Sequence, residues 1–353
     1  MRARSVGVAQ PSGLSTGGVT MGMQSLCRAG RATTAGLLAS TLLVAQSATG
    51  DPAAEASAPC FAPSGEAGRD SLLATMSSDG QFVAYHAMFR NFSGAMVRDL
   101  RQGTVCRIDL DANGQPVPPG PDVTIDRPAI SADGRFVAFV SRAPLVPGDT
   151  NTATDLFIRD RRRSVTVRVD VGSTSQQFGG LLGGSPAVSP DGRFVAFVSA
   201  AVDLVPGDTN GVRDVFVRDL PRGTIRRVSI STGGGRADAG SGQPAVSAGA
   251  RLVAFASAAT NLAPLGPGGS LSAVFAHDLT TGRTTRVSPA NPATTPYPSS
   301  SWAPFISADG RYVAFSIGGS NAVPGICVDR TNVLVADLQL RSYQTASSWC
   351  EGS

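Results

Sequence analysis

The sequence predicts an all-β fold, a β-propeller made of four-stranded antiparallel blades. The motif PAVSPDGRFVAFVS at residues 186–199 has further copies that begin near residues 74, 128, 244 and 304. The turn positions of the five copies, Asp79, Asp133, Asp191, Gly249 and Asp309, are 54, 58, 58 and 60 residues apart. Two more short, β-branched stretches follow each copy, and no long stretch after residue 50 has a 3.6-residue apolar period. Such repeats are typical of propeller blades.

Four strands, A to D, are expected in each repeat. Strand A carries a proline in four of the five repeats, at Pro128, Pro186, Pro244 and Pro304. Proline has no N–H to donate to a neighbouring strand, so strand A is expected to be an edge. In a propeller blade this edge is the innermost strand, which lines the central channel.

Strand B is apolar at consecutive positions, for example over residues 136–140 and 194–198. This pattern predicts that neighbouring blades cover both of its faces. Asp-Gly pairs at 79–80, 133–134, 191–192 and 309–310 are expected to supply the positive φ angles of a tight A–B hairpin. Gly249-Ala250 replaces the pair in the fourth repeat, so that turn must differ.

Strand C ends in aspartate in every repeat, at Asp99, Asp160, Asp219, Asp278 and Asp337. We expect these carboxylates to bond to the backbone of the C–D turn. His277 stands where other repeats carry Arg159 and Arg218, and is expected to face outward rather than act as a base. The arginine clusters at 161–163 and 226–227 are expected to be solvated side chains that protect a sheet edge.

The pattern P-x-[VI]-S-x-D-G-R-x-V-A-F, followed by an apolar strand that ends in Asp, resembles the WD40-like (PD40) repeat of TolB-type propellers. The resemblance covers roughly residues 70–348. It implies blades at approximately 70–110, 127–171, 185–230, 243–289 and 303–348. Family propellers often have six blades, so closure by five or by six blades stays open here. TolB proteins also carry an extra α/β domain before the propeller, and the chain is expected to lack it.

The N-terminus has the features of a secretory signal peptide over residues 1–50. Arg28 and Arg31 precede an apolar run from Ala35 to Ala45, and small residues follow at 48–50. Met21 or Met23 would give an ordinary start. Residues 51–69 are expected to be a linker, with the propeller over 70–353. The predicted location is therefore secreted or periplasmic, with no membrane span after signal removal.

Cysteine usage agrees with export. Beyond the targeting segment stand four cysteines, an even number in an oxidising compartment: Cys60, Cys106, Cys327 and Cys350. We prefer the pairs Cys60–Cys106 and Cys327–Cys350. A Cys60–Cys350 bond, which would tie the chain ends together, is the alternative.

The formal net charge is +4, and every basic residue is arginine. No aromatic residues alternate with the arginine clusters, so nucleic acid is not an expected partner. The expected partner is a protein or glycan of the cell envelope or outside the cell. The chain itself is expected to be a monomer.

The order of strands in a blade places A–B and C–D turns on one face and B–C and D–A loops on the other. The A–B and C–D turns are short, whereas the B–C and D–A loops are long and define what we call the long-loop face. We expect binding on this face. Residues just before strand A should ring the channel mouth there: Arg69, Asp70, Asp126, Arg127, Gln243 and Trp302. Such mixed polar groups could hold a peptide end or a sugar.

The sequence GDTN-x-x-x-D occurs twice in B–C loops. Its acidic and amide residues are Asp149, Asn151 and Asp155 in the second repeat, and Asp208, Asn210 and Asp214 in the third. They partly resemble calcium loops, which use hard oxygen ligands. The alternative, in which the side chains only satisfy the loop backbone, is favoured because proline replaces the first acidic ligand. No other cofactor is expected.

Three functions remain open. The first is an exported, non-enzymatic binding or scaffold module, since no catalytic motif occurs and the chain has only two histidines. The second is a glycan-active or lactone-type hydrolase, in which Asp70 and Asp126 would be the carboxylates. The third is a calcium-stabilised surface protein. No catalytic residue is assigned.

Overall fold

The computed structural model describes residues 60–61, 70–88, 93–116, 127–151, 153–172, 184–202, 204–264, 270–290, 299–318, 323 and 331–347. All of them belong to one of the two units into which the chain divides, Gly50–Ser353. The described residues form β-strands and one 3-10 helix. None of their helices is long and apolar enough to cross a membrane.

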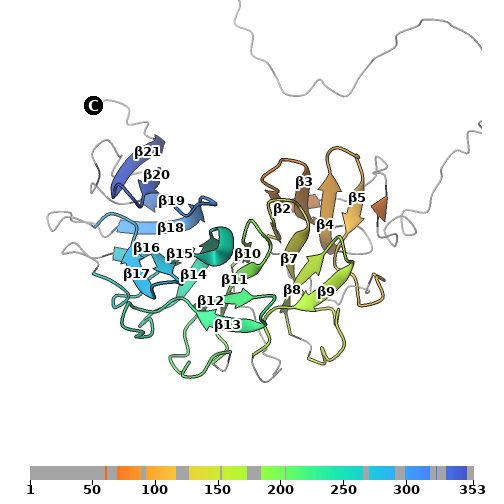
Figure 1. The fold of residues 1–353 in the computed structure, drawn as a ribbon, viewed down its shortest axis with the longest axis horizontal. Helices are drawn as coiled ribbons and strands as arrows, with labels where there is room; N and C mark the ends of the chain where they lie inside the picture. Colours follow the sequence, from red (N-terminus) through yellow and green to blue (C-terminus); the bar gives the residue numbers. More distant parts are fainter. Residues whose placement is uncertain are drawn as a thin grey trace, which may run out of the picture. The chain divides into compact units, whose positions relative to one another are not determined.

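Five repeated units of four antiparallel strands follow one another in chain order, and the last two are joined into one eight-stranded sheet (Figure 1). The first contains β2 (Asp70–Met76), β3 (Phe82–Met88), β4 (Ser93–Asp99) and β5 (Val105–Arg107), and β1 (Cys60–Phe61) pairs with β5. The second contains β6 (Ala129–Ile130), β7 (Phe136–Ser141), β8 (Asp155–Asp160) and β9 (Val165–Arg168). The third contains β10 (Ala187–Val188), β11 (Phe194–Ser199), β12 (Asp214–Asp219) and β13 (Thr224–Arg227).

The fourth unit contains β14 (Ser241–Val246), β15 (Leu252–Ser257), β16 (Ser270–Asp278) and β17 (Arg283–Arg286). The fifth contains β18 (Ser299–Ile306), β19 (Tyr312–Gly318), β20 (Asn332–Asp337) and β21 (Ser342–Ser347). These are the predicted blades, with strands A to D in order. The chain is thus an all-β propeller of repeated four-stranded blades.

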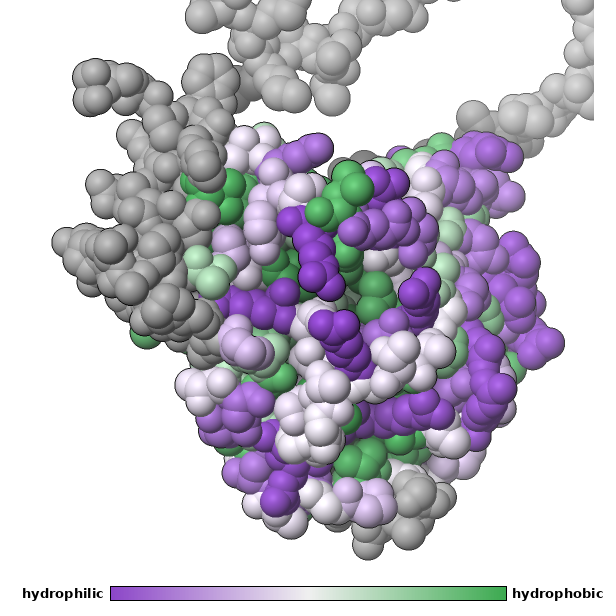
Figure 2. All heavy atoms as spheres, turned by 60° about the vertical axis from the view of Figure 1, so that its left-hand side comes forward, coloured by the Kyte–Doolittle hydropathy of each residue, from purple (hydrophilic) through white to green (hydrophobic). Residues whose placement is uncertain are grey.

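Strand B is buried on both faces in the third and fourth blades, as its continuous apolar run predicts, whereas in β19 of the fifth blade only alternate residues are buried. In β11, Val195 and Phe197 belong to one hydrophobic cluster, which also contains Leu156 of the second blade. Their neighbours Ala196 and Val198 belong to another cluster, shared with Phe255 of the fourth blade. Successive side chains of a strand point to opposite faces, so each face of this sheet packs against a different blade. On the surface shown in Figure 2, hydrophilic side chains predominate.

The A–B turns use glycine for a second reason besides backbone conformation. Gly134 and Gly192 have positive φ angles, 67° and 70°, whereas the aspartates before them do not. The aspartate side chains instead accept hydrogen bonds within the turn. A Cβ built on Gly134 would lie 2.0 Å from the Phe82 ring, and one on Gly192 would lie 2.1 Å from Phe136. A phenylalanine of the first blade and one of the second therefore pack directly on the A–B turn of the following blade.

The fourth A–B turn differs, as predicted. A 3-10 helix, Ala248–Ala250, replaces the Asp-Gly turn, and both Gly249 and Ala250 have positive φ angles, 62° and 50°. The backbone bond from Ala250 N to Ser247 O is nevertheless kept at 3.0 Å, matching Gly192 N to Ser189 O at 2.8 Å. The hairpin therefore connects strands A and B in the same way with another local conformation.

Strand A is an edge strand in the second and third blades, where Pro128 and Pro186 directly precede it. Pro244 and Pro304 lie within their strands, each at a β-bulge where the register shifts. The expectation of a free edge is wrong for β18, because its first residues, Ser299 and Ser300, pair in parallel with β16. Pro304 lies beyond that pairing, so its missing N–H costs nothing there.

The aspartates that end strand C bond to the C–D turn, as predicted. Asp160 accepts from the backbone N–H groups of Arg162 and Arg163 at 3.1 and 3.2 Å. It also receives two hydrogen bonds, of 2.9 and 2.6 Å, from the guanidinium of Arg135 in the Asp-Gly-Arg turn. Arg193 with Asp219 and Arg311 with Asp337 repeat this pair. The turn arginine thus ties the two hairpins of one blade together.

The expectation for His277 is wrong, and the expectation that the arginine clusters are solvated holds for Arg162, Arg163 and Arg226 but not for Arg161 and Arg227. His277 is only 3 % exposed, and its Nδ1 lies 2.8 Å from Thr284 Oγ1, which bonds to Ile230 O of the preceding blade. Arg227, with a side chain 10 % exposed, is an interior ion-pair partner rather than a solvated edge residue. Arg161 is half-buried over the Phe82 ring. Adjacent blades and loops cover these positions, which strand alternation alone does not reveal.

A disulfide bond joins Cys60 and Cys106, the preferred pair of the sequence analysis. The two residues face each other in the register of β1 and β5, so the bond holds β1 on the outer edge of the first blade. Cys327 and Cys350 lie outside the described residues, and their pairing stays a prediction.

Candidate functional site

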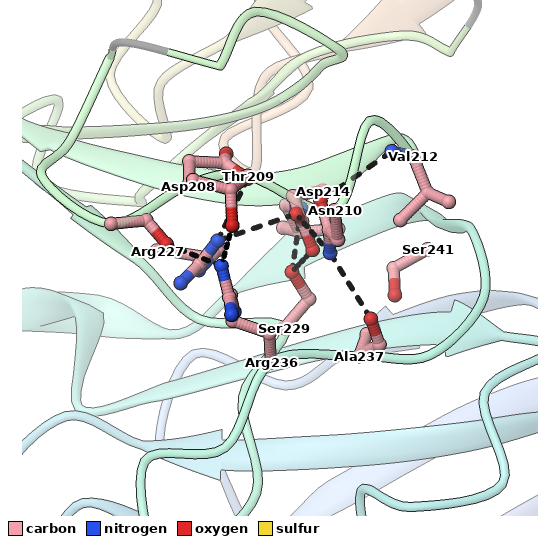
Figure 3. Close-up of polar contacts among 12 residues, drawn as sticks. Asp208, Thr209, Asn210, Val212, Asp214, Arg227, Ser229, Arg236, Ala237 and Ser241 are labelled. Carbon is pink, nitrogen blue, oxygen red and sulfur yellow. Dashed lines mark hydrogen bonds and ion pairs between the residues drawn. The ribbon is translucent and has the colours of Figure 1, made fainter.

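The B–C and D–A loops lie together and bond to one another, which confirms the predicted long-loop face (Figure 3). Arg236, in a D–A loop, donates to Gly207 O at 3.0 Å and to Thr209 Oγ1 in the B–C loop. Asn210 Nδ2 of the B–C loop donates to Ala237 O at 3.0 Å. Loops fixed to each other in this way present a defined surface rather than independent chains.

The same D–A loop also bonds to the B–C loop of the fourth blade. Asp238 of the D–A loop accepts from Thr260 N at 2.7 Å and from Thr260 Oγ1 at 2.5 Å. In return, Asn261 Oδ1 accepts from Asp238 N at 3.1 Å, and Asn261 Nδ2 donates to Arg236 O at 2.7 Å. These residues are exposed, so their remaining polar atoms are available to a partner.

In the third blade the GDTN loop brings Asp208, Asn210 and Asp214 together around a buried arginine (Figure 3). Arg227 Nη1 lies 2.9 Å from Asp208 Oδ1 and 3.6 Å from Asp214 Oδ2. Asp214 also accepts from Ser229 Oγ at 2.5 Å and from Asn210 Nδ2 at 3.2 Å. Burial, and then the charge of Asp214, raise the pKa of Asp208.

In the second blade three carboxylates surround one guanidinium. Arg168 pairs with Asp149 at 3.3 Å, with Asp170 at 3.1 Å, and with Asp155. All four side chains are at most 5 % exposed. Burial, followed by the charge of Asp170, raises the pKa of Asp155 to about 8, although Arg168 opposes the shift. Asn151 Oδ1 accepts from Ala153 N at 3.0 Å, an Asx-type contact.

An arginine therefore supplies the positive charge among the acidic oxygens of both GDTN loops. Among the residues that the structure describes, no group of three or more His, Cys, Asp or Glu side chains is arranged to hold a metal ion. Calcium binding by these loops stays a prediction. The contacts with Arg168 and Arg227 match the alternative, in which the motif supports the loop.

The arginines of strand D form a repeated feature of the fold, of which the sequence analysis named only Arg227, as part of a cluster expected to be solvated. Arg107, Arg168, Arg227 and Arg286 occupy the same register, opposite Met96, Phe157, Phe216 and Phe275 of strand C. The signal was visible in the sequence as R-x-D in the first two repeats and R-x-S in the next two. In the first blade, Asp109 accepts from Arg107 at 2.8 and 3.1 Å.

One of the predicted channel-mouth residues, Gln243 of the fourth blade, bonds to the fifth blade. Gln243 Oε1 accepts from Ala303 N at 2.8 Å, directly beside Trp302. Gln243 and Ala303 have positive φ angles, 52° and 50°, and each precedes the proline of a bulge. Positive φ in residues other than glycine is strained and clusters at functional sites. The Trp302 indole lies over Gly318, 3.4 Å from a Cβ built there.

The other mouth residues are described only in part. Arg127 lies two residues before β6 and is exposed, and Asp70 begins β2 opposite Met88. Arg69 and Asp126 lie outside the described residues. A ring of all six side chains stays a prediction.

Both histidines of the chain are interior. His86 is 6 % exposed and His277 is 3 % exposed, and burial lowers the pKa of each. A general base needs to reach a substrate. Their positions therefore give neither histidine access to a ligand on the surface.

The repeated four-stranded blades and their packing define the fold of this chain as a β-propeller. Similar solved structures include TolB from Acinetobacter baumannii, with 16 % identity and a TM-score of 0.45 over 78 % of this chain and 53 % of that one. A protein assigned as TolB from Agrobacterium tumefaciens has 15 % identity and a TM-score of 0.46 over 78 % and 80 % of the two chains. The chain thus spans about half of the first of these proteins.

An oligogalacturonate lyase in complex with manganese is similar as well, with 12 % identity and a TM-score of 0.50 over 80 % of this chain and 67 % of that one. At such identities the likeness concerns the fold alone. No protein-family model matches the sequence. No curated protein matches it either.

Proposed function

We propose that this chain is an exported, non-enzymatic β-propeller that binds a protein or glycan through its long-loop face, acting as a monomer. The observation that carries the proposal is the bonded layer of B–C and D–A loops around Arg236 and Asn261. Exposed polar groups held by a rigid sheet scaffold are the usual form of a binding surface.

Three further features support the proposal. Gln243 is exposed at a strained bulge beside this layer, where it joins two blades. The interior position of both histidines speaks for binding rather than acid–base catalysis. The Cys60–Cys106 disulfide and the predicted signal peptide favour an oxidising location, periplasmic or extracellular.

The proposal is tested by affinity capture from the envelope and culture medium of the source cells, with quantification by mass spectrometry. The chain is compared with a long-loop variant, Gln243→Ala combined with Arg127→Ala. A matched variant changes two exposed arginines of C–D turns, Arg163→Ala with Arg222→Ala. A parallel glycan array examines the same three proteins.

We expect at least one protein or glycan to be retained by the chain and by the C–D turn variant and lost from the long-loop variant. Circular dichroism melts must show that all three proteins are folded. Loss of the ligand from the C–D turn variant alone would place binding on the opposite face and overturn the proposal.

A further inference from the structure

The strand-D arginine of the fourth blade lacks the carboxylate that the first three blades provide. Arg107, Arg168 and Arg227 each pair with at least one aspartate. Two positions near Arg286 differ from the earlier blades. Ser288 stands where the first and second blades have Asp109 and Asp170. Ala273 stands where the second and third blades have Asp155 and Asp214. The fourth blade has kept the cation and lost its internal counterion.

The hydrogen bonds of Arg286 are correspondingly incomplete. Its Nε donates to Ser288 Oγ at 3.4 Å and its Nη2 donates to Pro289 O at 2.9 Å. Its Nη1 is buried and has no hydrogen-bond partner among the described residues. Burial lowers the pKa of this arginine. A buried cation without a counterion is unfavourable, so an anion that reaches it gains affinity.

Arg286 lines a groove of about 600 Å³ between the outer strands of the fourth and fifth blades. Figure 2 shows the side of the molecule that carries these blades, where hydrophilic side chains border recesses in the surface. Four other arginines and three aspartates line the groove: Arg251, Arg283, Arg311, Arg341, Asp278, Asp309 and Asp337. The lining therefore carries a formal net charge of +2.

The aspartates of the groove already have partners. Asp337 pairs with Arg311 at 2.8 Å, and Asp278 lies 3.8 Å from Arg251. Asp309 accepts from Ser307 Oγ at 2.5 Å and from Arg311 N at 3.0 Å. The excess positive charge consequently lies with Arg286 and with the exposed Arg283 and Arg341. This distribution favours an anionic ligand.

The neutral part of the lining suits hydroxyl groups and a ring. Thr281, Thr285, Gln339 and Ser342 offer hydroxyl and amide groups. The Tyr343 ring is held in place because its hydroxyl donates to Val287 O at 2.9 Å, and 37 % of the residue is exposed. A fixed aromatic ring with polar neighbours is a common surface for a sugar ring, whereas carboxylates suit arginine forks.

We propose that this groove binds an acidic saccharide, whose uronate carboxylate pairs with Arg286 and takes the place of the missing aspartate. Most of the lining comes from the outer strands and tight turns of the two blades, and Ala263 and Pro264 of a B–C loop also line the groove. The site does not depend on the function proposed above. It also assigns a binding role to a part of the tight-turn side, which the sequence predicts to be structural.

The test is isothermal titration of the full chain with a hexamer of mannuronate, with neutral mannohexaose as the matched ligand. We expect binding of the acidic hexamer only, and weaker binding as salt rises. Arg286→Gln should weaken it roughly tenfold or more, the loss expected of one charge-assisted hydrogen bond. Arg283→Ser, at an exposed position, tests the groove without disturbing the interior, and should weaken binding as well.

Ser288→Asp is the sharpest variant. It restores the aspartate that Arg107 and Arg168 have, so it should raise the unfolding temperature and weaken binding of the acidic hexamer at least fivefold. Arg163→Gln, at an exposed turn of another blade, should change neither property. Equal binding of mannohexaose, full binding by Ser288→Asp, or binding of poly-L-glutamate in place of the hexamer would overturn the proposal.

Discussion

Replacing Gly192 by alanine tests how consecutive blades are held together. The Gly192 Cα approaches the Phe136 ring of the preceding blade so closely that a Cβ would lie 2.1 Å from the ring. The residue also has a φ of 70°. Left-handed backbone costs an alanine about 1–2 kcal/mol. Overpacking against the ring adds about 1–3 kcal/mol.

Gly80→Ala is the matched control, because Gly80 occupies the same turn position in the first blade. Its φ is also 70°, but no described residue lies within 4 Å of a Cβ built there. Only the backbone cost of about 1–2 kcal/mol therefore applies. Equilibrium urea unfolding of both variants measures the difference in the free energy of unfolding. Equal losses in the two variants would refute the packing of Phe136 on this turn.

Three further predictions concern the charged clusters and the disulfide. Calcium in excess, or EDTA, should leave the unfolding temperature unchanged, because the guanidinium groups of Arg168 and Arg227 already lie among the GDTN carboxylates. A calcium-dependent rise of several degrees would show that the loops bind the ion. Folding raises the pKa of Asp155 from 3.8 to about 8. The folded chain therefore holds this proton more tightly than the unfolded chain does. The resulting stabilisation is fully present below pH 4 and is lost as the pH rises through 8. Asp155→Asn should therefore flatten the dependence of the unfolding temperature on pH between 4 and 8, and an unchanged slope would contradict the assignment. The Cys60–Cys106 bond joins residues that are 46 positions apart in the sequence. Its removal in the double variant Cys60→Ser with Cys106→Ser should lower the free energy of unfolding by about 2–4 kcal/mol. Reduction of the wild-type chain should give the same loss.

The sequence was sufficient for the architecture because the same local signals recur in each repeat. Continuous apolar runs marked strand B, and the aspartate at the end of strand C marked the following turn. The aspartate depends on neighbours in the same hairpin, as the hydrogen bonds of Asp160 illustrate, and the apolar run recurs because each inner blade packs between two others. The long-loop face followed from strand order alone.

The interior polar contacts could not be predicted in the same way. The alternating pattern of the outer strand gives no sign that Arg168 has a buried partner. In the structure, Asp149 of a loop and Asp155 of another strand pair with it. His277 reads as exposed, but a threonine of its own blade and a carbonyl of the preceding blade enclose it. Such positions depend on how blades pack, and sequence spacing does not encode that directly.

The strain at Gln243 was also missed, although the residue itself was singled out. The prediction rested on its place before a proline, where extended backbone is usual. The structure gives it a positive φ, because the bulge in β14 displaces the chain between Gly242 and Ala245. A local β-bulge of this kind depends on strand pairing and leaves only a weak signature in the sequence.

Site-specific photocrosslinking tests the central functional claim most directly. A benzophenone amino acid is placed at Thr209 or Asn261 on the long-loop face, and at Arg163 or Arg222 on C–D turns. Irradiation in the source cells should give a discrete crosslinked species from the long-loop positions and none from the C–D turns. Crosslinks from the C–D turn positions alone would contradict the account.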